Sequence, residues 1–436
     1  MTRNQTRNAA TRWHELLDAT RGVFNAASFG IFATLIGGWV LAPGRRTITA
    51  MIAAGDPESC RAHDAYHRFV RAGTWSTARL WQALVVVAVG RFCPDGPIPL
   101  DIDDTLYKKS GPRVDGAGIF RDAVRSTRSK TVYALGLNLV VITLRVTPPW
   151  RRCPLGLPVA VRLHRKGGPT TVDLACEMIT ELAAWFPERH FCLCGDGAYA
   201  TLCGRGLPRT TVTSRIRRDA ACYKPAPPPT GRRGRPRTKG DRLPTPDETA
   251  ASFDDKAFTK AQIDCRGQSV DVLVWTTKVL WYAVNRRDLL TLVIVRDPNH
   301  HQPDDFFVTT DPDATGAQVA SRYAGRWSIE CTFRDAKQAL GAEDPQSWKG
   351  QGPERAAMLS LWLYTAIWTW YIPTFGTSPT WTPRPWYPKK AVPSFIDALA
   401  SLRRCLWTQR ITPMSSHGPV SPEIIDSLLD TLTRAA

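Results

Sequence analysis

Apolar residues recur at helical intervals near both ends of the chain. From residue 12 to about residue 90, Trp13, Leu16 and Leu17 begin a series of apolar positions three and four residues apart, and polar turns interrupt the series. Helical spacing returns at Thr315 and dominates to the C-terminus. The pattern therefore predicts helical regions at both ends of the chain.

The middle of the chain carries strand patterns instead. Residues 97–105 (PIPLDIDDT) alternate apolar with acidic side chains, and residues 130–145 (KTVYALGLNLVVITLR) form a long run rich in Val, Leu and Ile. Three shorter strand segments and one amphipathic helix follow, at 158–163, 190–195, 209–216 and 171–186 respectively. Together they predict an α/β sheet of mixed strand direction.

A change of composition separates this sheet from a second strand-rich segment. The stretch KPAPPPTGRRGRPRTKG, which ends at residue 240, is too rich in Pro, Gly and Arg to pack a core and predicts an exposed basic linker. Its RGRPR run, with Arg233, Arg235 and Arg237, matches the core of an AT-hook, which binds a narrow minor groove. A nonspecific phosphate-binding or solubilising linker is the alternative. Alternating segments after the linker predict a mostly β insertion over 217–305.

The charge balance favours a polyanionic partner. Lys and Arg number 57 against 39 Asp and Glu, for a net charge of +18, and nucleic acid is the commonest such partner. A genome rich in G and C would also inflate the arginine content, so charge alone decides little. The 11 cysteines contain no CxxC pair, which argues against a zinc site or a disulfide framework and favours the cytoplasm.

Two charge-free stretches, 23–42 and 356–372, are nearly long enough to cross a bilayer. The first contains Asn25, Ser28 and a Gly pair, and the second is interrupted at Pro373 and rich in Trp. We expect both to be core helices and expect no membrane partner. A basic membrane-associated protein is the competing interpretation.

Four polar residues near the C-terminal third share one helical stripe. Tyr323, Arg326, Glu330 and Lys337 are three, four and seven residues apart, which places them within roughly 60° of one another on an α-helix. An ordinary solvated helix face would also collect such residues. The stripe alone therefore does not distinguish a functional site from an ordinary solvated surface.

Acidic residues at the ends of apolar strands provide further evidence for a functional site. Asp103 and Asp104 end the LDIDDT segment, and Asp196 ends FCLCGDG. A carboxylate at the end of a buried strand is costly without a partner, and a metal ion is a suitable one. Two aspartates and a glutamate could hold two Mg²⁺ ions, the arrangement used for phosphodiester displacement. Each isolated Asp could equally serve as a turn or helix-cap residue.

These segments together resemble a known family. The spacing Tyr323-x2-Arg326-x3-Glu330-x6-Lys337, with Trp327 between, is similar to the signature of bacterial DDE insertion-sequence transposases of the IS-four group, and IDDT and CGDGAY resemble that group's first and second aspartate motifs. The agreement extends over residues 97–341. The resemblance implies a ribonuclease H-like mixed α/β sheet flanked by helices, with a β-rich insertion and helical N- and C-terminal regions.

The resemblance also implies roles for individual residues. Asp196 and Glu330 would be the second and third metal ligands, and the first would be Asp103 or Asp104, with Asp103 favoured narrowly. The cofactor would be two Mg²⁺ ions, with Mn²⁺ as a substitute. Tyr323, Arg326 and Lys337 would contact DNA phosphates near the cut. Arg215, Arg217 and Arg218, at the start of the insertion, would either add to the same DNA channel or form a solvated hairpin edge. The other expected DNA-binding residues are Arg233, Arg235 and Arg237 of the linker.

The expected organisation has five parts. They are a helical DNA-binding region (1–92), the first part of the catalytic core (93–216), the linker and β-rich insertion (217–305), the last part of the core with the Glu helix (306–345) and a helical C-terminal region (346–436). The implied protein is a bacterial, nucleoid-associated transposase that cuts double-stranded DNA at terminal inverted repeats, joins it to target DNA and acts as a homodimer. A nuclease without strand transfer and an inactive DNA-binding copy are the alternatives.

Overall fold

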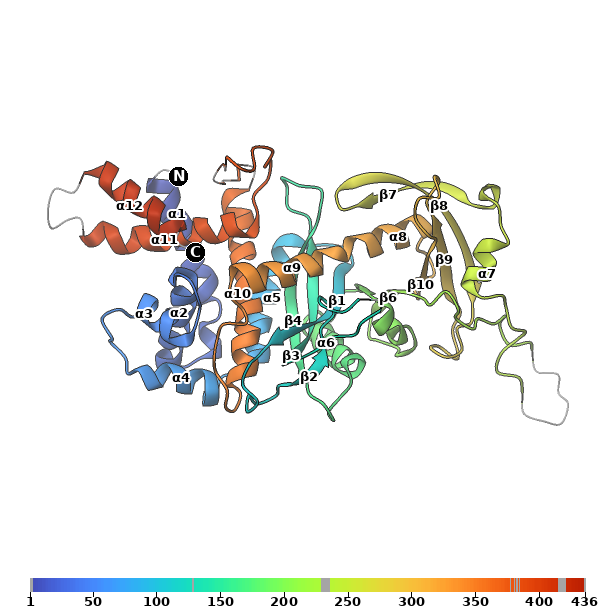
Figure 1. Ribbon diagram of the computed structural model, residues 1–436, viewed down its shortest axis with the longest axis horizontal. Helices are drawn as coiled ribbons and strands as arrows, with labels where there is room; N and C mark the ends of the chain where they lie inside the picture. Colours follow the sequence, from blue (N-terminus) through green and yellow to red (C-terminus); the bar gives the residue numbers. More distant parts are fainter. Residues whose placement is uncertain are drawn as a thin grey trace.

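The computed structural model places the two helical ends of the chain together, beside a large central sheet (Figure 1). It describes residues 3–127, 129–228, 236–376, 378–379, 381, 383, 385–414 and 421–434. The N-terminal helices are α1 (Arg3–Asp18), η1 (Arg21–Val23), α2 (Ala26–Leu41), α3 (Ile48–Gly55), α4 (His63–Ala72) and α5 (Thr77–Phe92). The C-terminal helices are α10 (Gly352–Phe375), α11 (Phe395–Met414) and α12 (Pro422–Arg434).

Helix α10 is the centre of this helical body. It is buried on every side from Gly352 to Ile372 except at Glu354, and the Trp370 indole packs edge-on against Trp13 of α1 with ring centroids 6.2 Å apart. Pro373 lacks the N–H that would bond to the carbonyl of Thr369, and Arg91 of α5 donates to that carbonyl at 3.0 Å instead. Among the residues that the structure describes, no helix is long and apolar enough to cross a membrane.

The core sheet has the mixed strand directions expected from the sequence. Its strands are β1 (Ile98–Lys108), β2 (Gly118–Arg121), β3 (Tyr133–Val146), β4 (Leu155–His164), β5 (Phe191–Gly195) and β6 (Thr210–Arg215). Strand β3 pairs antiparallel with β1 and β4, whereas β5 pairs parallel with β1 and β6. The long apolar runs of β3 and β4 form these strands because both faces are buried. This is the ribonuclease H-like α/β arrangement that the resemblance implies, and the prediction of fold class is confirmed.

Helices cover the sheet and connect it to the helical body. Helix α6 (Thr171–Trp185) begins with a capping box at Thr170 and lies near β3 and β4, while the 3-10 helix η2 (Gly197–Gly204) connects β5 to β6. Helices α8 (Gly316–Gly325) and α9 (Trp327–Ala339) follow one another across the molecule, and α9 packs on β4 and β1 (Figure 1).

The predicted single stripe is divided between these two helices. The N–H of Arg326 bonds to the carbonyl of Tyr323 at 3.1 Å, which is the tighter three-residue spacing of a 3-10 turn. Gly325 ends α8 against the Arg145 guanidinium, and a Cβ at this glycine would lie 2.7 Å from Arg145 Nη1. This close approach favours glycine where the two helices meet.

The β-rich insertion extends the core sheet. It contains α7 (Pro246–Ala251), η3 (Asp255–Ala257), β7 (Thr259–Cys265), β8 (Gln268–Val279) and β9 (Leu290–Arg296), and β10 (Asp305–Thr309) follows where the core is expected to resume. Strand β10 pairs with β6, and the order continues through β9 and β8 to β7, to give one ten-stranded sheet. Helix α8 packs across this extension on a small apolar cluster that includes Val293, Phe307 and Val319.

The hairpin between β7 and β8 reaches back toward α9 (Figure 1). Arg266 and Gly267 form its tip with φ values of 54° and 82°, and a Cβ at Gly267 would lie 2.9 Å from the backbone nitrogen of Cys153. The Arg266 guanidinium carbon lies 4.1 Å from the ring centroid of Trp327, the first residue of α9. The tip therefore docks beside the start of that helix.

Candidate active site

Strand β1 carries three carboxylates near the middle of the sheet. Side chains alternate along a strand, so Asp101 and Asp103 lie on one face and Asp104 lies on the other. Asp101 is fully buried. Its carboxylate pairs with the Arg145 guanidinium, whose Nε donates at 3.0 Å, and lies 3.4 Å from the hydroxyl of Ser328 on α9. These contacts join β1 to β3 and α9. Next to them lie Asp103, Asp104, Asp196 and Glu330, which we call the acidic cluster.

Asp103 and Glu330 share one guanidinium. Arg326, at the junction of α8 and α9, donates from Nη1 to Asp103 Oδ2 at 2.8 Å and from Nη2 to Glu330 Oε1 at 3.0 Å. Glu330 lies one helical turn beyond Arg326, so both face β1 together. Two of the predicted acidic residues, distant in the sequence, are thus joined through a single cation.

Asp196 approaches the same place from the neighbouring strand. In the parallel pairing of β5 with β1, Gly195 lies opposite Ile102, so the next residue of each strand is Asp196 and Asp103. Asp196 caps η2, because its Oδ1 accepts from the N–H of Ala198 at 2.9 Å. The Ser214 hydroxyl on β6 donates to the Asp196 carbonyl at 2.7 Å. Strand pairing therefore places Asp196 beside β1, and local hydrogen bonds fix it at the start of η2 and against β6.

The carboxylates affect one another's protonation. Burial raises the pKa of Asp103 to about 7; the Arg326 guanidinium opposes this change, and the negative charge of Asp196 adds to it. Loss of water around the carboxyl group raises the pKa of Asp104 as well, followed by repulsion from Asp196. Asp104 also accepts from the Tyr199 hydroxyl at 3.5 Å. Of the described arginines, Arg326 contacts Asp103 and Glu330 directly, whereas Arg145 pairs with Asp101 below them.

The other predicted residues of the stripe are held by protein contacts. The Tyr323 ring packs against Phe307 with centroids 4.5 Å apart, and the guanidinium carbons of Arg326 and Arg215 lie 5.5 Å and 5.8 Å from its centroid. Lys337 is largely enclosed, and its Nζ donates to the Leu106 carbonyl on β1 at 2.9 Å. Tyr323 adjoins the acidic cluster through Arg326, whereas Lys337 lies farther along β1.

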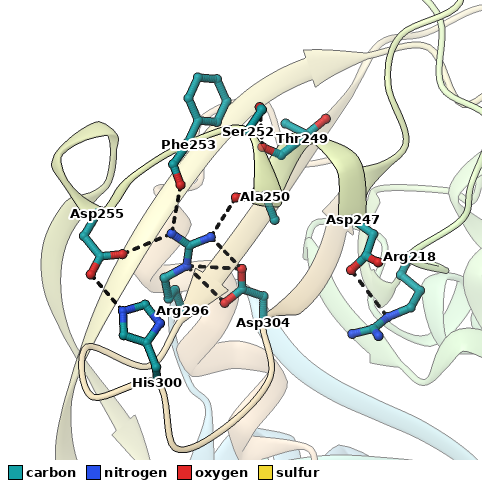
Figure 2. A network of polar contacts seen from close by, with 10 residues as sticks. All are labelled: Arg218, Asp247, Thr249, Ala250, Ser252, Phe253, Asp255, Arg296, His300 and Asp304. Carbon is teal, nitrogen blue, oxygen red and sulfur yellow. Dashed lines mark hydrogen bonds and ion pairs between the residues drawn. The ribbon is translucent and has the colours of Figure 1, made fainter.

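The predicted arginines of the insertion are dispersed. Arg215 pairs with Asp305 of β10, and Arg217 pairs with Asp219 at 2.7 Å. Arg218 lies 3.8 Å from Asp247 of α7 (Figure 2). Exposed Arg237 lies 3.8 Å from Asp241. The remaining two residues of the predicted AT-hook, Arg233 and Arg235, lie outside the described residues.

A buried arginine organises the segment that follows the linker. Arg296 on β9 donates to Asp304 at 2.9 Å, to Asp255 at 3.0 Å and to the backbone carbonyls of Ala250 and Phe253 at 2.8 Å and 3.2 Å. Figure 2 shows its guanidinium at the centre of these partners. Two of the acceptors are carbonyls at and just after the end of α7, so Arg296 joins this helix to the extended sheet.

Two supports of the site were not anticipated from the sequence. The first is the buried pair of Asp101 and Arg145, for which the alternation of LDIDDT was the available signal, because it places Asp101 on the face of Asp103. The second is Tyr199, which follows Asp196 in the same motif and contacts Asp104. No local pattern indicates that contact, because it depends on the pairing of β1 with β5.

A ribonuclease H-like sheet that brings aspartates from neighbouring strands and a helical glutamate together has the architecture of an acidic-triad nuclease. The family model described as DDE superfamily endonuclease matches residues 24–270, more than half of the chain, and the chain belongs to this family. The matched segment includes Asp103, Asp104 and Asp196, whereas Glu330 lies beyond it. No curated protein matches the chain.

Enzymes of this superfamily generally use divalent metal ions. Within the described part of the chain, no three His, Cys, Asp or Glu side chains lie close enough together to form a metal site by themselves. The chemistry of the donors nevertheless fits, because carboxylate oxygens suit hard divalent cations. Burial and the neighbouring Asp196 raise the pKa of Asp103 even though Arg326 contacts it, and a bound cation would favour its charged form. The residues present are therefore compatible with a divalent cation.

Proposed function

We propose that this protein is a DNA transposase of the IS-four group that cuts double-stranded DNA at the ends of an insertion sequence and joins them to target DNA. The observation that carries the proposal is the Arg326 guanidinium, which joins Asp103 to Glu330 beside Asp196. The arginine and the glutamate both belong to the Y-R-E-K spacing. The family match independently supports endonuclease chemistry.

Asp103, Asp196 and Glu330 would hold two Mg²⁺ ions, with Mn²⁺ as a substitute. The contact that Asp103 shares with Glu330 favours it over Asp104, which lies on the opposite face of β1. When bound, the metal ions would activate the attacking oxygen and stabilise the leaving one. Arg326 would keep the two carboxylates oriented, and Asp101 with Arg145 would hold β1 in position.

The remaining parts would position DNA. Tyr323 and Arg215 adjoin the acidic cluster and could contact phosphates near the cut, whereas Lys337, Arg217, Arg218 and the linker arginines would act farther away. The helical region 1–92 would bind the terminal inverted repeats. Synapsis of two element ends would require a homodimer, and the protein would act in the bacterial cytoplasm on the nucleoid.

The test is cleavage of duplex DNA that carries the element end, with Mg²⁺, by wild type and by Glu330→Gln. We expect the variant to bind the duplex as wild type does and to lose at least about 100-fold in cleavage rate, as expected for removal of a residue that acts through metal. The matched control is Glu354→Gln on α10, where the native side chain pairs with Arg165 at 2.8 Å, away from the acidic cluster.

Three outcomes separate the competing functions. Cleavage followed by joining of pre-cut ends to a supercoiled plasmid supports a transposase. Cleavage without joining supports a nuclease alone, and end binding without cleavage by wild type supports an inactive copy. If Glu330→Gln cleaved as fast as wild type, the assignment of the site would be wrong.

A further inference from the structure

A cavity with basic walls lies at the opposite end of η2 from Asp196. A cavity of about 550 Å³ opens between the end of this helix and the turn before β9. Its lining includes Gly204, Arg205 and Gly206 on one side and Arg286, Arg287 and Asp288 on the other. None of these arginines belongs to the acidic cluster.

The two walls of the cavity are joined by specific contacts. Buried Asn285 donates from Nδ2 to the carbonyl of Cys203 at 3.1 Å, and its Oδ1 accepts from the N–H groups of Arg287 and Asp288 at 2.9 Å and 3.0 Å. A Cβ at Gly204 would lie 1.9 Å from the carbonyl oxygen of Val284. The turn is therefore fixed against η2, and the backbones that carry the arginines are pre-organised.

The cavity has an excess of positive charge. Arg205 pairs at 3.3 Å with Asp173, and Asp288 accepts from Asn285 at 3.3 Å. In the described ranges no carboxylate lies within ion-pair distance of Arg286 or Arg287. Two exposed guanidinium groups are thus available to an anionic ligand, and a planar guanidinium suits phosphate oxygens.

The linker returns to the edge of this cavity. The Arg286 guanidinium carbon lies 5.4 Å from the Tyr282 ring centroid, and Lys239 Nζ lies 5.0 Å from the same centroid. The Thr238 and Tyr282 hydroxyls lie 3.1 Å apart. One tyrosine therefore joins the arginines of the cavity to the basic segment that ends the linker, and the positive surface is continuous.

The distance from the acidic cluster suits duplex DNA. Asp196 precedes η2 and Arg205 follows it, and eight residues of a 3-10 helix span about 16 Å. That length corresponds to about five base pairs, at roughly 3.4 Å for each. The outward side chains of η2 are small, at Gly197, Ala198 and Thr201, so a phosphate backbone could lie along the helix without a bulky obstacle.

We propose that Arg205, Arg286 and Arg287 form a binding site for the phosphate backbone of duplex DNA about five base pairs from the cleavage point. This inference rests on the proposed function for the position of the cut. As a phosphate contact, the site would fix the register of the duplex and would carry no base-sequence information. Its effect is to hold the DNA register while the acidic cluster acts.

The test compares two triple variants that lose equal charge. Arg205→Ala, Arg286→Ala and Arg287→Ala together remove the cavity arginines, whereas Arg113→Ala, Arg121→Ala and Arg125→Ala remove three exposed arginines on and around β2. Binding to fluorescein-labelled end-bearing duplexes is measured by anisotropy in EDTA over a range of salt. One duplex extends about 3 bp beyond the cleavage point toward the cavity, and the other extends about 15 bp.

For the long duplex, we expect the cavity variant to bind roughly 10- to 100-fold more weakly than the control variant, with a salt slope smaller by about 2 to 3. For the short duplex, the two variants should bind equally. Equal binding of the long duplex by both variants would overturn the proposal. That result would leave cleavage by wild type and its loss in Glu330→Gln untouched, so the two proposals fail separately. Unchanged thermal unfolding of both variants confirms that the comparison concerns folded protein.

Discussion

Replacing Asp103 by Asn should stabilise the metal-free protein while removing its activity. The amide resembles the protonated carboxyl group, which the folded protein prefers because burial and Asp196 raise the pKa of Asp103 to about 7. In the unfolded chain an aspartate titrates near 3.9. The folded state therefore binds one more proton than the unfolded state between these two pH values.

The sign and size of the effect follow from this difference. A raised folded-state pKa contributes stability that is complete below pH 4 and is lost as the pH rises through 7. The loss is about 1.4 kcal/mol for each pH unit, on the order of 4 kcal/mol in total. Asp103→Asn does not show that loss, because the amide does not titrate in this pH range. The variant should exceed wild type by only about 1 kcal/mol at pH 4.5 and by as much as about 4 kcal/mol at pH 8.

The assay is urea unfolding in EDTA at intervals from pH 4.5 to pH 8. The matched control is Asp101→Asn, two residues away on the same face of β1. It leaves the buried Arg145 without its partner, so it should lower the free energy of unfolding by about 3 to 5 kcal/mol. We therefore expect Asp103→Asn to raise the free energy of unfolding at pH 8 and Asp101→Asn to lower it. An Asp103→Asn variant less stable than wild type at pH 8 would refute the reasoning.

Two further perturbations test the supports of the site and of the insertion. Arg326→Ala removes the guanidinium that lowers the pKa of Asp103, so the acidic limb of the cleavage-rate profile should move to higher pH, and Arg326→Lys should restore part of the shift; superimposable profiles of wild type and Arg326→Ala would contradict this role. Arg296→Ala leaves Asp304 and the α7 carbonyls without their donor, so urea unfolding should show a loss of about 3 to 5 kcal/mol; a change below about 1 kcal/mol would mean that the network is replaceable.

The strands of the core could be predicted because a buried strand produces a continuous run of apolar residues in the sequence. Strand β3 covers Tyr133–Val146 and was expected at 130–145, since a strand buried on both faces is a continuous apolar run. The three acidic motifs could be located by resemblance. That the chain belongs to the DDE superfamily endonucleases is confirmed, whereas the IS-four subgroup stays a prediction.

Features that depend on contacts between distant segments could not be predicted. The junction at Arg326 forms where Gly325 meets Arg145, and neither residue's own neighbours indicate that meeting. Nothing in the sequence near Arg205 indicates that it shares a cavity with Arg286. The pairing of β9 with β10, which itself pairs with β6, likewise makes the insertion part of the same sheet as the core, and no local pattern indicates that pairing.

The pairing of β10 with β6 has a consequence for the order in which the active centre is completed. The aspartates of β1 and at the end of β5 are synthesised early. Helix α9, which carries Glu330, follows α8, and α8 packs on the strands of the extension. Contacts between such remote segments close late in folding. A nascent or truncated chain that ends before Glu330 would therefore carry two of the three acidic motifs and lack the third, and under the proposed function it would not cleave DNA.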